Sequence, residues 1–530
     1  MLTTLAAPAF AKTWHIEDGN ITVKAGETKG TNKVSQGANQ EVEDTDTIIT
    51  NREDKASSNT VTIDAGSDKV EVTLQDVNIK ADSGSALTSK GDVTLTLKGD
   101  NSFTGGISGN SSYDLSGISS SGSLTISGGE TDSLTAQGGS GENGGDGIFS
   151  FGRVAISGGT VNATGGVGSS RNGGSGIYSS NSSVTISGGT VNAAGGNGNF
   201  SGGCGIYNSG SLIISDGTVN ATGGNGKDGY GGYGISSSDV AISGGTVNAN
   251  GGDSKDGYGG NGISSSSGVA ISDGTVNANG GDSKNGSGGS GIFSFDRVAA
   301  ISGGTVNANG GNGGSGDGIR SFAPVAISGG AVTANGGSGN SSGGNGIYSR
   351  NDIDLSGSLE LTAKAGSPNG KALSQKGSEL DLDTIKDKLG PGAKVTATDA
   401  DGKVIDQIPI PRPVEPEESS SSSDGGSAAP SAPAFSLPGL TVTDKDGQRI
   451  SYTSTQSGNT LTVCVGRLTA SFRISLAALR QLRAEGIETI TFQTVLCSTT
   501  LSVDELLAMG GEDAEAVLTH RFTDSSLTVG

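Results

Sequence analysis

A segment of 27 to 30 residues recurs along the middle of the chain, and this period limits the fold more than any other feature. A typical copy reads Gly-Ile-Tyr-Ser and then Val-Thr-Ile-Ser-Gly-Gly-Thr-Val-Asn-Ala. One repeat cannot bury its apolar residues alone, so successive repeats must stack into a solenoid. The isoleucines that open the copies are Ile118, Ile148, Ile177, Ile206, Ile235, Ile263, Ile292, Ile319 and Ile347.

Each repeat contains three short stretches in which apolar and polar residues alternate, as they do in half-buried strands. The alternation places Ile177, Ser179, Val184, Ile186, Val191 and Ala193 inside, so an inward serine column is expected beside the apolar ones. Tyr178, Thr190 and Asn192 point outward. Three parallel strands per repeat predict an all-β fold, a right-handed parallel β-helix of about ten coils that each rise about 4.8 Å.

We place this solenoid and its end caps at residues 12–408, with the regular repeats at 115–365. Near the N-terminal end, Ile16 is expected in a short strand. Near the C-terminal end, we expect a short capping helix over Thr384–Leu389 and a hairpin over Val395–Ile405 that turns at Asp401-Gly402.

Composition agrees with this interpretation and excludes some partners. Glycine accounts for 96 of 530 residues, but it falls at fixed places in the repeat, which favours turns over disorder. The formal net charge is −21, which disfavours binding to nucleic acid or to anionic membrane surfaces. No stretch approaches the roughly 18 apolar residues of a membrane-spanning helix.

The two ends of the chain differ from the repeats. Residues 1–11 end in Ala9-Phe10-Ala11, a small-x-small pattern that predicts the remnant of a secretory signal and a secreted or cell-surface protein. An ordinary flexible terminus is the alternative. Residues 409–438 are rich in proline and serine and predict a disordered linker.

Residues 439–530 predict a small α+β domain. Ser475 and Ser502 are expected to cap two short helices that end before Gly486 and Gly510. The last strand-like stretch, Leu527–Val529, has no evident closing partner in the sequence, which indicates that this domain is incomplete. Cys464 and Cys497 lie in this domain, and whether they pair stays open.

Outward-facing columns are the candidate ligand-binding surfaces, because the faces and loops of a solenoid carry its function. One column follows the first strand and is rich in aromatic residues, which suit the faces of sugar rings; the alternative is that they pack under neighbouring loops. A second column follows the third strand, and its amides suit sugar hydroxyls or ice, or simply stabilise the rod by stacking. The candidate ligand-binding residues are Phe149, Tyr178, Tyr207, Phe293, Arg320, Tyr348, Asn192, Asn220, Asn248 and Asn277.

Acidic residues in the glycine-rich loops are candidate calcium ligands. The stretch from Gly223 to Tyr230 loosely fits a calcium-binding nonapeptide, although the nine-residue period is missing. Carboxylate oxygens suit this ion, and the alternative is that these residues are solvated turn residues. The candidate metal ligands are Asp228, Asp253, Asp256 and Asp282.

Catalysis is the less favoured alternative. Glycoside hydrolysis needs a carboxylate pair across the scissile bond. The best cluster is Asp296-Arg297 with Asp317 and Arg320 on neighbouring coils, amid Gly/Ser loops rather than a deep acidic cleft. The two histidines, His15 and His520, lie far apart in the sequence, so no histidine-based triad can be assembled from sequence neighbours.

The units Val-Ala-Ile-Ser-Gly-Gly-Thr-Val-Asn-Ala and the lead-in Val70–Gly105, with Val-Thr-Leu-Thr-Leu-Lys-Gly-Asp-Asn, resemble the carbohydrate-binding β-helix family of clostridial cell-surface proteins. The resemblance covers about residues 13 to 390. It implies a pectate-lyase-like fold in a Gram-positive bacterium, and binding of acidic polysaccharide with calcium and without established catalysis. No ligand motif of the family can be placed on particular residues.

These observations predict an exported, non-catalytic surface protein that binds polysaccharide, such as a host or cell-wall glycan, on the outer faces of its β-helix. A structural adhesin or spacer rod is the first alternative. A pectate-lyase-like enzyme is the second.

Overall fold

A computed structural model describes residues 11–53, 55–107, 115–180, 182–409, 439–444, 447–450, 452–457, 459–465, 469–494, 498–511, 514–520 and 525–529. The chain divides into two compact units, Met1–Ile410 and Pro411–Gly530. The predicted signal-peptide residues 1–10, nearly all of the linker, and Cys497 lie outside the described residues.

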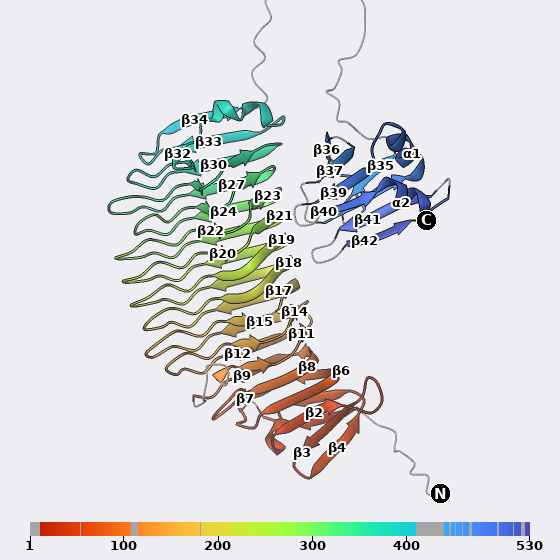
Figure 1. Ribbon diagram of the computed structural model, residues 1–530. Coiled ribbons are helices and arrows are strands. Elements are labelled where there is room, and N and C mark those ends of the chain that lie inside the picture. The colour runs from red at the N-terminus through yellow and green to blue at the C-terminus, as the bar shows by residue number, and fades with distance from the viewer. Residues whose placement is uncertain are drawn as a thin grey trace, which may run out of the picture. The chain divides into compact units, whose positions relative to one another are not determined.

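The first unit is a parallel β-helix, as predicted, and its strands stack coil upon coil (Figure 1). It has roughly 14 turns, more than the ten expected, because coils continue on both sides of the regular repeats. The first strand of the coil appears as β10 (Ile118–Ser120), β13 (Ile148–Ser150), β16 (Ile177–Ser179), β20 (Ile263–Ser265), β22 (Ile292–Ser294), β25 (Ile319–Ser321), β28 (Ile347–Ser349) and β31 (Leu373–Gln375).

The second and third strands of a coil are separate in some coils and continuous in others. The second strands are β11 (Leu124–Ser127), β14 (Val154–Ile156), β23 (Ala299–Ile301), β26 (Val325–Ile327) and β29 (Ile353–Leu355). The third strands are β7 (Asn78–Lys80), β9 (Asp100–Thr104), β12 (Ser133–Gln137), β15 (Thr160–Thr164), β24 (Thr305–Asn309), β27 (Gly330–Asn335) and β30 (Leu359–Lys364). Longer strands that join two or three of these are β6 (Val61–Gln75), β8 (Leu87–Lys98), β17 (Val184–Ala194), β18 (Ile206–Thr222), β19 (Ile235–Asn250) and β21 (Val269–Asn279).

Equivalent residues pair in register from coil to coil, so each apolar position becomes a column. Ile177 lies opposite Ile148 on one side and Ile206 on the other. The predicted inward residues Val184, Ile186 and Val191 are fully buried. The expected serine column also points inward: Ser237 donates to the carbonyls of Gly210 and Asp239, both at 2.8 Å, and thereby fastens the turn after its own strand.

Both ends of the solenoid are capped, which protects open strand edges from pairing with other chains. At the N-terminal end, β1 (Lys12–His15) pairs with β5 (Thr47–Thr50), and β2 (Ile21–Ala25) carries the antiparallel strands β3 (Asn32–Gln36) and β4 (Asn39–Asp44). A 3-10 turn, η1 (Ile16–Asp18), lies between β1 and β2, where Ile16 was expected in a strand. At the C-terminal end, β31 carries the short antiparallel strand β32 (Ser378–Glu379), and β33 (Lys394–Thr398) and β34 (Val404–Pro409) form the hairpin expected around Asp401-Gly402. The expected capping helix is two 3-10 turns, η3 (Leu382–Thr384) and η4 (Lys386–Lys388).

The glycine-rich loops form an ordered wall, here called the glycine slab, which projects from one side of the strands (Figure 1). The slab comprises residues 165–175, 195–204, 223–233, 251–261, 280–290 and 310–317. Each loop has two glycine arms joined by backbone hydrogen bonds: Gly203 donates to Gly196 at 2.9 Å, Gly224 to Gly203 at 2.8 Å, and Gly232 to Gly224 at 2.8 Å. This zigzag continues from loop to loop, so the loops are far more regular than the expected closing turns.

The second unit is the predicted α+β domain, with two four-stranded sheets. Its helices are α1 (Leu476–Ala484) and α2 (Val503–Ala508), and Ser475 and Ser502 cap them as expected. One sheet contains β35 (Leu440–Thr443), β38 (Ala470–Ser475), β41 (Glu515–His520) and β42 (Ser525–Val529), and the other contains β36 (Thr453–Ser457), β37 (Thr460–Cys464), β39 (Thr489–Gln493) and β40 (Ser498–Ser502). The expectation that the last strand lacks a partner is wrong, since β42 pairs antiparallel with β41.

We expect Gly232→Ala to destabilise the β-helix. An added Cβ at this position would lie 1.9 Å from the carbonyl oxygen of Gly203, so the slab would have to separate. Overpacking of this kind costs about 1–3 kcal/mol. Gly268→Ala is the control, because its nearest atoms would be the Arg297 Cβ at 3.1 Å and the Val298 carbonyl oxygen at 3.3 Å, so only a small shift is needed. Chemical denaturation of both variants tests the prediction, and equal losses of stability would contradict it.

We also expect the second unit to lose stability in acid. His520 is fully buried, its Nε2 lies 2.9 Å from the Thr499 hydroxyl, and burial lowers its pKa from the usual 6.5. The folded state therefore disfavours the protonated ring, so stability is greatest above pH 6.5 and falls as the pH drops below it. Hydrogen exchange of this unit's peptides in the full chain should show a lower stability at pH 5 than at pH 7.5. In the His520→Gln variant, the difference in stability between the two pH values should be smaller.

Candidate functional site

The outward column of the first strand forms a continuous aromatic stack along part of the rod. The ring centroids of Phe149 and Tyr178 lie 5.3 Å apart, and those of Tyr178 and Tyr207 lie 4.7 Å apart with planes inclined by 19°. The second spacing is close to the rise of one coil, so the ring faces are turned along the rod axis. Phe149 was expected on the surface, but it is 1% exposed beneath Phe151 and cannot meet a ligand directly.

This aromatic column is interrupted for two coils. After Tyr207 the paired positions are Ser236 and Ser264, and the column resumes with Phe293. We call this interruption the serine gap. It is a recess of about 290 Å³ with aromatic walls at both ends and small polar residues between them. Its lining comprises Tyr207, Asn208, Ser209, Ser236, Ser237, Ser238, Ser264, Ser265, Ser266, Phe293 and Phe295.

A second recess of about 320 Å³, here called the corner recess, lies where the glycine slab meets the first strand. Tyr230 and Tyr258 project from the slab, stack with centroids 5.6 Å apart, and are each about half exposed. Phe293 lines both this recess and the serine gap. The lining comprises Tyr230, Tyr233, Tyr258, Gly259, Asn261, Ser287, Gly288, Gly289, Ser290, Phe293, Ser315 and Arg320.

Arg320 is the cation of the corner recess and is held by several contacts. Its guanidinium lies 3.1 Å from the carboxylate of Asp317, which is fully buried. It also lies 5.0 Å from the ring centroid of Tyr348 and 5.2 Å from that of Phe322, both within the range of cation–π attraction. Arg320 and Tyr348 were predicted site residues and meet through this contact. Phe293 was also predicted, and it packs edge-on against Phe322 with ring centroids 5.5 Å apart.

The asparagine column forms a ladder of side-chain amides. Each amide nitrogen donates to the oxygen of the preceding coil: Asn192 to Asn162 at 2.7 Å, and Asn220, Asn248 and Asn277 each to the previous member at 2.8 Å. A second ladder, which the sequence analysis did not identify, joins Asn250, Asn279, Asn309 and Asn335. The structure therefore favours stacking within the rod over ligand binding for this column.

The four aspartates proposed for calcium belong to two different columns. Asp253 and Asp282 each accept a backbone N–H of the following coil, at 2.8 Å and 2.7 Å. Asp256 accepts from Asn285 at 2.6 Å, and this contact lowers its pKa. Within the described part of the chain, no three His, Cys, Asp or Glu side chains lie close enough together to hold a metal ion. Calcium binding by Asp228, Asp253, Asp256 and Asp282 stays a prediction.

The cluster considered for catalysis is divided between two ion pairs. Asp317 pairs with Arg320, whereas Arg297 pairs with Asp239 on another coil at 3.7 Å. These contacts therefore do not join Asp296 and Arg297 to Asp317 and Arg320 in the one cluster that was expected. Catalytic activity itself remains untested.

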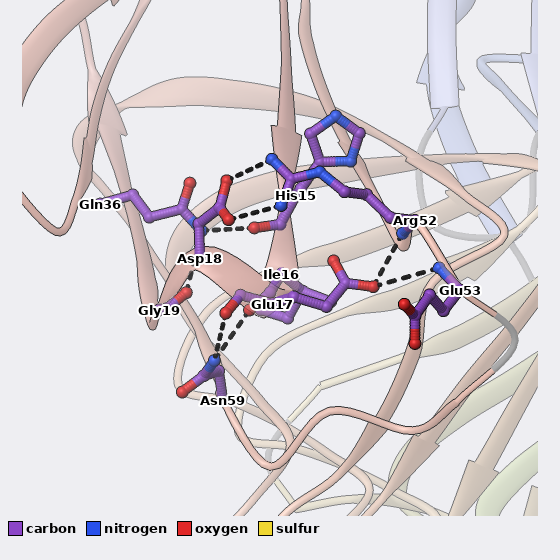
Figure 2. Close-up of polar contacts among 9 residues, drawn as sticks. All are labelled: His15, Ile16, Glu17, Asp18, Gly19, Gln36, Arg52, Glu53 and Asn59. Atoms are coloured by element: carbon purple, nitrogen blue, oxygen red, sulfur yellow. Dashed lines mark hydrogen bonds and ion pairs between the residues drawn. The ribbon is translucent and has the colours of Figure 1, made fainter.

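A separate polar cluster closes the first coil at the N-terminal end (Figure 2). The Arg52 guanidinium donates to both oxygens of Asp18, at 2.5 and 2.6 Å, and this contact lowers the pKa of that carboxyl. Glu17 accepts from the backbone N–H of Arg52 at 2.7 Å, and Asn59 donates to the carbonyl of Ile16 at 2.9 Å. These groups point at one another and at the backbone, so the cluster is a clasp that holds the end cap.

A recess of about 430 Å³ lies under the turn between β2 and β3. It is lined by threonines and by charged residues such as Glu27, Asp46 and Lys69, and it contains no aromatic side chain. The serine gap and the corner recess therefore form the better candidate ligand site.

The comparisons agree with the architecture and go no further. The Beta helix repeat family model matches residues 154–177, 184–206, 212–239, 240–267 and 269–291. These segments include the serines on the floor of the serine gap and most of the corner recess, but not Tyr207 or Phe293, so the chain is similar to β-helix repeat proteins over much of its candidate site. No curated protein and no solved structure gives a significant match. No helix among the described residues is long and apolar enough to cross a membrane.

We expect Asp146→Asn to stabilise the β-helix at neutral pH. Asp146 is 6% exposed, accepts the Ser175 N–H at 2.6 Å, and has its pKa raised by burial to about 7. The folded state disfavours the charged form, so stability falls as the pH rises from about 4 to about 7. Asparagine keeps the acceptor, as Asn261 does for Ser290 in the same column.

The expected gain is on the order of 3 kcal/mol at pH 8 and disappears near pH 4. Denaturation at both pH values measures it. Asp317→Asn is the opposite case, because it leaves Arg320 without its buried partner and should destabilise. A gain from Asp146→Asn that is independent of pH would contradict this account.

Proposed function

We propose that this chain is an exported, non-catalytic protein that binds polysaccharide at the serine gap and the corner recess. The observation that carries the proposal is the lining of these two recesses. Aromatic rings from the first strand and from the slab stand beside serine hydroxyls and an asparagine amide. Apolar walls with a few placed polar groups are typical of ligand sites.

Sugar rings match this combination because they have apolar C–H faces and polar edges. The faces are attracted to aromatic rings, whose π-systems carry negative charge on their faces. The hydroxyls of the ring edges can bond to the Ser236 and Ser264 side chains on the floor of the gap. The negative net charge of the whole chain adds no general attraction for an anionic polymer, so affinity must come from local contacts.

Arg320 supports a preference for glycans that carry acidic groups. Its guanidinium can donate to a carboxylate while it keeps its contact with Asp317, since it has five N–H donors. Export rests on the Ala9-Phe10-Ala11 pattern. We base the proposed assistance by calcium on the loop aspartates. Calcium is varied in the experiment below and is not included in the proposed site.

A structural rod that displays the second unit is the alternative function. The amide ladders and the zigzag of slab hydrogen bonds favour it, because they stiffen the solenoid without any ligand. This alternative predicts no selective glycan binding.

We expect Phe293→Ala to lower glycan affinity at least tenfold, because Phe293 lines both recesses. Phe200→Ala is the matched control: Phe200 is 52% exposed and belongs to the lining of neither recess. A plant and mucin glycan array, read with calcium and with EDTA, is the measurement. Absence of binding to every glycan would favour the structural-rod alternative. Equal effects of the two variants would show that the binding site lies outside the two recesses.

A further inference from the structure

The serine gap can be understood as a break in an aromatic stack. The Phe149–Tyr178–Tyr207 stack runs along the rod axis, so the next position in the same stack falls in the gap. At that position the chain has Ser236 and then Ser264, and only after these does Phe293 follow. The outer face of Tyr207 is therefore left without an aromatic neighbour from the next coil.

The dimensions of the gap suit an inserted ring. Three coil steps separate Tyr207 from Phe293, which is about 14 Å at about 4.8 Å per step. An aromatic ring is about 3.5 Å thick, since stacked carbon atoms meet at about 3.5–4 Å. About 10 Å thus remains between the two walls, which accommodates a pyranose chair and its substituents. A ring stacked on Tyr207 would lie across the rod axis.

Such a ring is bordered by protein on several sides. Along the axis it meets Tyr207 at one end, and its substituents extend towards Phe293 and Phe295 at the other. Towards the strands it meets the floor serines, and towards the following turn it meets Ser238 and Ser266.

Towards the slab the ring meets the boundary with the corner recess. There the Asn261 amide donates to the Ser264 hydroxyl at 3.3 Å, and Asn261 lines the corner recess while Ser264 lines the gap. The remaining open side faces outward. The linkages of a pyranose leave from its ring edge, so this geometry leaves room for one linkage rather than two.

We propose that the serine gap recognises the terminal ring of a glycan chain, inserted between Tyr207 and Phe293, rather than a ring within the chain. This inference rests on the proposed function and specifies which part of the glycan the protein recognises. Ser236 and Ser264 determine this specificity, because their small side chains create the gap and their hydroxyls face the ring edge.

Ser264→Phe tests the gap directly, because it restores an aromatic residue to a column that carries phenylalanine at the next coil. It should lower binding more than tenfold. Ser119→Phe is the matched control: Ser119 lies in the same column next to Phe149, so the same substitution extends the stack away from the gap. Tyr207→Ala is a second variant that removes one wall and should also lower binding about tenfold. Thermal unfolding of each variant establishes that it folds.

The probe is a printed array of plant and mucin glycans that are attached through their reducing ends, in matched pairs with and without the non-reducing terminal residue. We expect binding to the intact member of a pair only, and competition by the methyl glycoside of that terminal residue. Equal binding to both members would overturn the terminal-ring inference and leave the proposed function standing. Unchanged binding by folded Ser264→Phe would overturn it as well. Absence of binding to every pair would overturn both.

Discussion

In-register pairing of parallel strands is the interaction on which the whole β-helix depends. It places each residue about 4.8 Å from its counterpart in the next coil, so every position in the repeat becomes a column. The same spacing lets isoleucines form a dry core, lets asparagine amides bond in a ladder, and lets tyrosine rings stack. It also lets the glycine arms of the slab approach so closely that a Cβ would not fit at Gly232.

A column of identical residues stabilises the fold. Where the residue type changes within a column, the surface acquires recesses and charges that can have other roles. The aromatic column becomes a recess only where Ser236 and Ser264 interrupt it. Arg320 enters the same column two coils later and brings a cation to the corner recess. Asp146 and Asp317 occupy one column, but the contacts give a cationic partner to Asp317 and not to Asp146, so we expect neutralisation to have opposite effects at the two positions.

The sequence was sufficient for the features that repeat. The inward column of Ile177, the inward serines and the asparagine column follow from alternation and period alone. Alternation could not show that Phe151 would cover Phe149, since that contact comes from a turn residue outside the pattern. Alternation also could not predict the regular slab, because glycine has no side chain whose polarity would indicate whether the residue faces inward or outward. The clasp of Glu17, Asp18 and Arg52 joins residues more than thirty positions apart, which no local pattern records. The corner recess also joins residues from different coils, so local sequence patterns did not predict it. The tyrosines in the glycine-rich loops were a signal that could have indicated it.

We propose that ligands bind where the aromatic column is interrupted. A crystal structure of the chain with a glycan selected on the array tests it most directly. We expect a sugar ring stacked on the outer face of Tyr207, with its edge towards Ser236 and Ser264. A glycan bound along the asparagine ladder, with the serine gap empty, would contradict it.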